Sequence, residues 1–265
     1  MKKLPVIPIV TMTLVWLPAL TNAQTKTSAV PRTVDGKPDF TGVWQAGNNR
    51  RGTWAEANTQ GLGGLVLPPA AAGTRELAPY QPWAAKKVLE SFNRRGIDDP
   101  VAQCLAPGVP RVTTVGLFPM QIVQTPQTIV ILYEYLNVFR VIPINAKHPD
   151  DLEPSFMGDS VGHWEGDTLV VDVTSFNDRT WLVNTGTFHS DALHVTERYT
   201  RVDADTIRYE ATMEDPNVLT KPWVYRTTIM RRDGTRLREY ACEENNLDRD
   251  RYEKLLKDES VFRRK

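Results

Sequence analysis

The chain has 265 residues, of which 41% are hydrophobic and 24% are charged. Its 32 basic residues (Lys and Arg) are balanced by 32 acidic residues (Asp and Glu), so the formal net charge at pH 7 is zero. A balanced chain lacks the basic surface typical of proteins that bind nucleic acids or anionic lipids. We therefore expect no nucleic-acid partner; the expected partner is a small-molecule ligand or substrate, or another protein.

Residues 1–23 have the pattern of a secretory signal peptide. Two lysines precede an apolar stretch interrupted by prolines, and the small residues that end at Ala23 form a suitable cleavage site. The prolines disfavour a spanning helix, and no later stretch has the roughly 20 apolar residues that a span needs. We predict an exported protein, periplasmic or secreted, that is cleaved near Ala23 and has no stable membrane span. An uncleaved N-terminal anchor is the alternative.

Residues 24–110 are predicted to form an irregular segment, rich in proline and glycine, that packs on the domain after it. One strand is expected at residues 40–45. One helix is expected at residues 82–95, because Pro82 lies near its first turn and Gly96 follows its end.

Residues 111–246 consist mainly of short runs in which apolar and polar residues alternate, the pattern of half-buried strands. Turn signals at residues 165–167, 203–205 and 233–234 join successive runs, and the last of them, Asp-Gly, is a strong hairpin signal. About eight strands joined by tight turns close most economically into an antiparallel barrel. We therefore predict a mainly β fold, an antiparallel barrel with short flanking helices, followed by a helical tail at residues 247–265.

The Gly-x-Trp motif in "FTGVWQ", on the first expected strand, is similar to the opening of lipocalin-like (calycin) β-barrels. The longer strings "DGKPDFTGVW", "MGDSVGHWEGDTLVVDVTSFND" and "HSDALHVTERYTRVDADTIRYEATMEDP" resemble a broad family of largely uncharacterised exported bacterial proteins. The resemblance implies a lipocalin-like barrel with a cup-shaped ligand cavity. It implies no set of catalytic residues.

The sequence contains two cysteines, Cys104 and Cys242. In an exported protein an even cysteine count suggests a disulfide, and two cysteines allow one pairing. We predict this disulfide, which would tie the irregular first third of the chain to the end of the barrel. Two buried free thiols, or metal ligation by both sulfurs, are the alternatives.

Three charged residues share a strand face with apolar side chains, because residues two apart on a strand point to the same side. They are Glu134, Arg140 and Glu197. A carboxylate buried among apolar neighbours must be paired or protonated, since an isolated buried charge costs several kcal/mol. One hypothesis is a structural ion pair of Arg140 with Glu134 or Glu197. The other is a catalytic set in which the carboxylates transfer protons and Arg140 stabilises charge.

His189 and His194 are candidate proton-transfer groups, and Asp159 is a weaker candidate. His194 and Glu197 are three residues apart, which places them on opposite faces of a strand and does not match a zinc-binding helix. We expect neither an organic cofactor nor a metal; a divalent metal at His189 and His194 is the alternative. Ser160 is a poor nucleophile candidate, because no α/β sheet is expected to present it.

Aromatic residues are numerous on the expected strands and loops. They could line a cavity for a partly apolar or aromatic ligand, or they could form ordinary barrel core. The candidates for ligand contact are Tyr133, Trp164, Trp181, Tyr199 and Tyr209.

The favoured hypothesis is an exported barrel enzyme that acts on a partly apolar or aromatic substrate by acid–base chemistry without a cofactor. A lyase, an isomerase or a hydrolase would fit it. The main alternative is a non-catalytic periplasmic carrier of the lipocalin type, in which the same residues recognise the ligand. A structural protein of the cell envelope and a metal-dependent enzyme are the remaining hypotheses.

Overall fold

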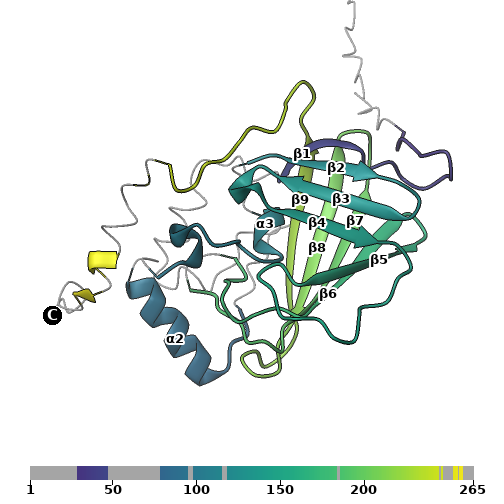
Figure 1. Ribbon diagram of the computed structural model, residues 1–265. Helices are drawn as coiled ribbons and strands as arrows, with labels where there is room; N and C mark the ends of the chain where they lie inside the picture. The colour runs from purple at the N-terminus through teal and green to yellow at the C-terminus, as the bar shows by residue number, and fades with distance from the viewer. Residues whose placement is uncertain are drawn as a thin grey trace, which may run out of the picture.

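The computed structural model describes residues 29–46, 78–94, 98–114, 118–183, 186–244, 246, 253–255 and 257–258 (Figure 1). The predicted signal peptide lies outside these residues, as does most of the expected helical tail. Within the described ranges, no helix combines the length and the apolar character needed to cross a membrane.

Strands dominate the described residues, and they belong to one nine-stranded antiparallel sheet. The strands are β1 (Gly42–Ala46), β2 (Met120–Gln124), β3 (Thr128–Tyr133), β4 (Phe139–Pro143), β5 (Asp159–Glu165), β6 (Thr168–Thr174), β7 (His194–Arg201), β8 (Thr206–Glu214) and β9 (Trp223–Arg231). The helical elements are α2 (Pro82–Asn93), η1 (Pro100–Gln103), α3 (Arg111–Thr114) and η2 (Tyr135–Asn137). The fold is mainly β, as predicted.

The sheet rolls into a nearly closed barrel (Figure 1). Its strand order is β4-β3-β2-β1-β9-β8-β7-β6-β5, so β4 and β5 are the two edges. The edges meet just beyond the end of β4, where the Asn145 amide donates to the Gly162 carbonyl oxygen at 2.7 Å and Ile144 forms a bridge with Gly162. The prediction of an antiparallel barrel is confirmed.

Local sequence signals account for most of these elements. The turn after β5 contains Gly166, whose φ of 59° favours glycine. In the turn after β7 the Asp203 carboxylate accepts a hydrogen bond from the Asp205 amide at 2.8 Å, as short acidic side chains do in turns. The first strand is shifted slightly from the expected residues 40–45, and α2 ends two residues before the expected end of the helix.

The expected hairpin at Asp233-Gly234 is wrong. Gly234 does adopt a turn conformation, with a φ of 73°, but the described residues after it form no strand. The reason is that β9 already pairs with β1 on one side and with β8 on the other, which leaves no free edge for a tenth strand. The barrel strands therefore end at Arg231, earlier than the expected boundary at residue 246.

The two ends of the barrel are covered by different parts of the chain. At the end that carries the tight turns after β2, β5 and β7, which we call the turn end, the N-terminal segment is bound by an ion pair between Arg32 and Asp167 at 2.6 Å. There the Gln124 side chain also accepts a hydrogen bond from the Phe40 amide at 2.7 Å. We call the opposite end the helical end, because α3 lies there with all four of its residues buried, and α2 lies toward the same side (Figure 1).

Burial alternates along the strands, as expected for a barrel with one face inside. On β7 the residues Val195, Glu197, Tyr199 and Arg201 are buried, and the residues between them are only partly buried. Most interior positions are aliphatic or aromatic, so the few charged groups among them lie in apolar surroundings.

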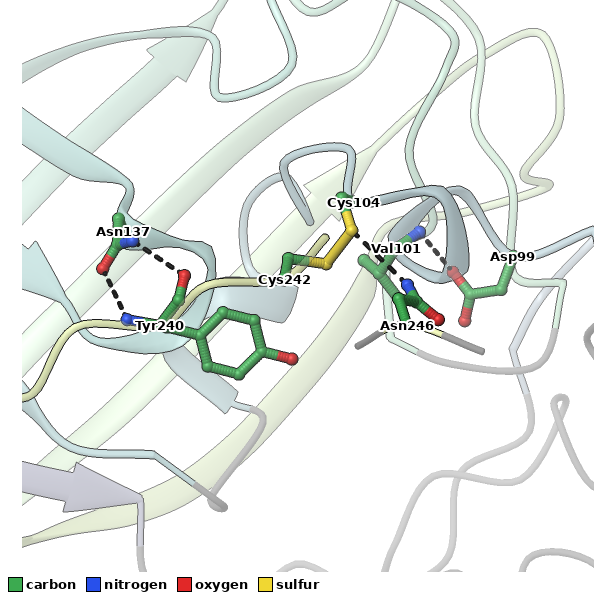
Figure 2. Close-up of a disulfide and its surroundings, with 7 residues drawn as sticks. All are labelled: Asp99, Val101, Cys104, Asn137, Tyr240, Cys242 and Asn246. Carbon is green, nitrogen blue, oxygen red and sulfur yellow. Dashed lines mark hydrogen bonds between the residues drawn. A yellow bond between two sulfur atoms is a disulfide. The ribbon is translucent and has the colours of Figure 1, made fainter. Parts of the chain in front are cut away.

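A C-terminal strap, residues 232–244, runs from the end of β9 back to the helical end. The Asn137 side chain binds the Tyr240 backbone twice, donating to its carbonyl oxygen at 2.8 Å and accepting from its amide at 3.2 Å (Figure 2). Beyond that point Cys242 forms a disulfide with Cys104, with an S–S distance of 2.08 Å. The predicted disulfide is confirmed, and it joins the strap to the segment that leads into α3.

Candidate functional site

Seven polar side chains gather inside the barrel toward its helical end, and we call them the interior cluster. Strand alternation brings most of them together, since each lies at an inward position of β3, β4, β5, β7 or β8, and α3 supplies one more. All seven are buried. They are Thr113, Tyr133, Arg140, Ser160, Glu197, Tyr199 and Tyr209.

An ion pair between Arg140 and Glu197 forms the centre of this cluster. The Arg140 Nη2 atom donates to Glu197 Oε2 at 2.5 Å, and the two side chains are 2% and 0% exposed. The Arg140 Nη2 and Nε atoms also donate to Ser160 Oγ, at 2.8 Å and 3.3 Å. Of the two partners that the sequence left open for Arg140, the structure therefore pairs it with Glu197.

The remaining nitrogen of Arg140 has no partner. Nη1 is buried, and none of the hydrogen bonds among the described residues involves it. A buried donor without an acceptor costs about 1–3 kcal/mol, and more when the group is charged. Such an atom needs an explanation, because natural folds leave few of them.

Glu197 is fully engaged on its other oxygen. The Tyr199 and Tyr209 hydroxyls donate to Glu197 Oε1 at 2.9 Å and 2.8 Å, so the carboxylate accepts three hydrogen bonds in all. Three of the four acceptor positions of the carboxylate are thus occupied, and one position, on Oε2, is left for a proton from a substrate. The arrangement therefore suits a charge that is held in place better than a proton acceptor.

The electrostatics of the cluster keep Arg140 charged and its tyrosines neutral. Burial alone would lower the pKa of Arg140, but the charge of Glu197, its hydrogen bond and the nearby Tyr133 and Tyr199 together outweigh burial, and the pKa of Arg140 is raised well above its usual value. Burial, reinforced by the charge of Glu197, raises the pKa of Tyr199 and Tyr209 well above 10. Tyr133, whose hydroxyl lies 3.0 Å from Thr113 Oγ1, also has a pKa raised by burial, against an opposing effect of Arg140.

His189 lies in the loop between β6 and β7 and is buried. Its Nδ1 atom lies 2.8 Å from the Ser190 carbonyl oxygen and its Nε2 atom 2.6 Å from Thr180 Oγ1. This geometry fits a neutral ring that donates from Nδ1 and accepts at Nε2. Burial lowers the pKa of His189, against the opposing effects of Ser190 and Asp215. No hydrogen bond among the described residues links His189 to the interior cluster.

His194 and Asp159 lie on the outer face of the sheet. The Asp172 carboxylate lies between two histidines, 2.5 Å from His194 Nε2 and 2.9 Å from His148 Nε2. His148 Nδ1 lies 2.5 Å from Asp159 Oδ2, and His194 Nδ1 lies 3.5 Å from Glu214 Oε2. These five partly exposed side chains form a continuous series, which we call the outer-face chain.

Glu134 lies outside the barrel interior, contrary to its expected position on a strand face. β3 ends one residue earlier, and Leu136 and Asn137 adopt φ values of 59° and 50°, so the chain turns away from the strand. The Glu134 carboxylate instead accepts a hydrogen bond from the Arg238 amide at 2.8 Å and helps to hold the C-terminal strap.

The five aromatic candidates divide among three places. Tyr133, Tyr199 and Tyr209 belong to the interior cluster. Trp164 stacks on Phe40 near the turn end, with ring centroids 5.8 Å apart. Trp181 lies in the loop after β6, with the Arg111 guanidinium 6.0 Å from its ring centre.

Five residues of these two groups were not candidates from the sequence: Thr113 and Ser160 of the interior cluster, and His148, Asp172 and Glu214 of the outer-face chain. Ser160 shares its inward direction with Gly162 on β5, which strand parity could have indicated. Thr113 and His148 come from a short helix and a loop, where no periodicity marks a direction. In the described part of the chain, no three His, Cys, Asp or Glu side chains are placed to hold a metal ion together.

Comparison with known proteins identifies no family for this chain. No protein-family model matches the chain, and neither does any curated protein. No solved structure matches it either.

Proposed function

We propose that this protein is a small-molecule-binding barrel of the lipocalin type, which holds a partly apolar ligand inside without transforming it. The groups expected to carry acid–base chemistry are dispersed: Glu197 points inward, His194 lies on the outer face, and Glu134 binds the strap. A carrier requires no proton transfer among them. This favours the carrier over the interior acid–base enzyme.

The observation that supports a ligand is the unpaired Nη1 atom of Arg140. A barrel that served only as a scaffold would gain nothing from a buried guanidinium with a free N–H edge, because apolar residues of similar size are at least as stabilising. A ligand that accepts a hydrogen bond from Nη1 would offset this cost. Ligand sites commonly combine an apolar lining with a few polar groups of this kind.

Probe binding to two matched variants tests the proposal. Ala211 lies opposite Glu197 in the β7–β8 pair and faces the interior, whereas Thr212 follows it on the outer face. We expect Nile red, a neutral apolar dye, to bind saturably to the wild type and to Thr212→Phe, and at least tenfold more weakly to Ala211→Phe. Ala211→Leu serves if the larger residue prevents folding. Equal binding by the inner and outer variants would contradict a site inside the barrel.

A second candidate function is acid–base catalysis at the outer-face chain. The short contacts of His194 and His148 with Asp172 favour it, because a carboxylate beside an imidazole orients the ring for proton transfer. The test is hydrolysis of p-nitrophenyl butyrate near pH 7. Catalysis predicts a loss of about a hundredfold in His194→Gln and none in His163→Gln, whose ring is exposed elsewhere on β5. Equal rates would exclude this hydrolysis.

We also propose that the protein is exported. The disulfide supports this, since such bonds persist mainly in oxidising compartments. Expression of the full chain in a bacterium, followed by mass measurement of the periplasmic fraction, tests it. A mature chain that begins at Gln24 is expected, and an unprocessed cytoplasmic protein would contradict it.

A further inference from the structure

The charge balance of the interior cluster limits what the proposed carrier can hold. Arg140 and Glu197 together have no net charge, and they are in direct contact with both side chains almost completely buried. A carboxylate ligand at Nη1 would add a third charge and leave one negative charge uncompensated in the barrel. Uncompensated buried charge is strongly unfavourable.

The hydrogen-bonding groups of the cluster restrict the ligand further. The Tyr199 and Tyr209 hydroxyls already donate to Glu197, and Ser160 accepts from Arg140. Nη1 of Arg140 and the Ser160 O–H keep unused donor capacity, and Nη1 can only donate. A complementary ligand therefore needs an acceptor oxygen without a negative charge.

The apolar side chains around the interior cluster indicate the chemical character of the remaining part of the ligand. Ile131 of β3 lies opposite Arg140 in the β3–β4 pair, and Val171 of β6 lies opposite Glu197 in the β6–β7 pair. Both are almost completely buried, like most interior positions. Such surroundings favour apolar atoms over polar ones.

We propose that the ligand is a neutral, largely apolar molecule with a carbonyl oxygen, such as a ketone, ester or lactone, which accepts a hydrogen bond from Arg140 Nη1. The inference rests on the carrier function and specifies its ligand class. Arg140 is the residue that selects for the carbonyl, and Glu197 is the residue that selects against an acid.

Competition among three probes of similar size tests the inference. Prodan, a fluorescent neutral ketone, reports binding at pH 7.4, and acetophenone, benzoate and ethylbenzene compete with it. For the wild type we expect acetophenone to compete about tenfold better than ethylbenzene, the value of one hydrogen bond to a charged donor, and benzoate to compete worst. Arg198→Met, an outward-facing change next to Glu197, is the control and should keep this order.

Two variants should each change the order of the three competitors, and in different ways. Glu197→Gln leaves Arg140 as an unbalanced cation, so benzoate should become the best competitor. The double variant Arg140→Met with Glu197→Gln removes both charges, so acetophenone and ethylbenzene should compete equally. The double variant keeps the measurement possible if the single one does not fold.

The outcomes separate the two proposals. If prodan binds and benzoate competes best with the wild type, the carrier stands and the neutral-ligand inference fails. The inference also fails if ethylbenzene equals acetophenone with the wild type, since water rather than ligand then satisfies Nη1. If neither prodan nor Nile red binds, the carrier function fails, and the inference fails with it.

Discussion

Gly162 on β5 lies so close to Ile142 on β4 that a Cβ atom at residue 162 would be 2.9 Å from Ile142 Cγ2. This is the seam where the barrel closes. Gly162→Val should hold the edges apart and lower the free energy of unfolding by about 1–3 kcal/mol, the usual cost of overpacking. Urea denaturation measures it. His163→Val, the adjacent outward position, should change stability by less than about 0.5 kcal/mol. Equal effects would show that the seam is not tight.

The buried ion pair predicts strong coupling between its two residues. Arg140→Met alone should destabilise the protein by about 3–5 kcal/mol, because Glu197 is left charged and without its cation. Adding Glu197→Gln should restore part of that loss, since Gln can still accept the tyrosine hydrogen bonds. Urea denaturation of the wild type, the two single variants and the double variant measures this coupling as a double-mutant cycle.

A surface ion pair between β7 and β5 is the matched control. Arg198 and Glu165 lie 2.7 Å apart, but both are substantially exposed. The corresponding cycle, Arg198→Met with Glu165→Gln, should show a coupling below about 1 kcal/mol. A coupling at Arg140 and Glu197 that is no larger would mean that the interior pair is not desolvated in solution.

His189 predicts a loss of stability in acid. Burial lowers its pKa in the folded protein below the usual value of about 6.5 for histidine. As the pH falls through about 6.5, the unfolded chain takes up a proton that the folded protein does not, so unfolding becomes easier. The stabilisation from the neutral ring is thus complete above about pH 6.5 and declines toward the lower, folded pKa.

Unfolding free energies at pH 8 and pH 5 measure this contribution. His189→Gln should lower stability at pH 8 but lose less between pH 8 and pH 5 than the wild type does. An unchanged pH dependence in His189→Gln would assign the acid sensitivity to other groups.

The disulfide predicts a large contribution to stability, because Cys104 and Cys242 are 138 residues apart. In the chain-entropy model, closing a loop of that length restricts the unfolded state by about 5 kcal/mol, and removal of native disulfides typically costs about 2–5 kcal/mol. Cys104→Ser with Cys242→Ser should reproduce this loss in urea denaturation. Reducing agent should lower the stability of the wild type to that of the variant and leave the variant unchanged. No difference between oxidised and reduced protein would contradict the prediction.

Much of the barrel could be predicted because strand parity is a local property. Alternation with Val195 and Tyr199 sets the direction of Glu197, and Ile142 does the same for Arg140. The pair between them joins β4 to β7, strands that are not neighbours in the sheet. Parity therefore indicated which side chains point inward, but their pairing follows from closure of the whole barrel.

The two wrong predictions concern features that a local sequence pattern does not determine. Glu134 has apolar neighbours two residues away, yet positive φ values at Leu136 and Asn137 end the alternation without any glycine to signal it. The Asp233-Gly234 turn is a genuine local signal, but strand formation after it needed a free sheet edge, and β9 has none. Whether a new strand can pair with β9 depends on the topology of the whole sheet and not on the turn.

The disulfide between Cys104 and Cys242 at the helical end also fixes an order of events during biosynthesis. Cys104 leaves the ribosome long before Cys242, which follows the last strand, β9, in the sequence. The bond between them cannot form until all nine strands have been synthesised and the chain has reached an oxidising environment. The segment that leads into α3, the helix whose Thr113 contacts Tyr133, therefore receives its covalent link only after the nine strands have been synthesised.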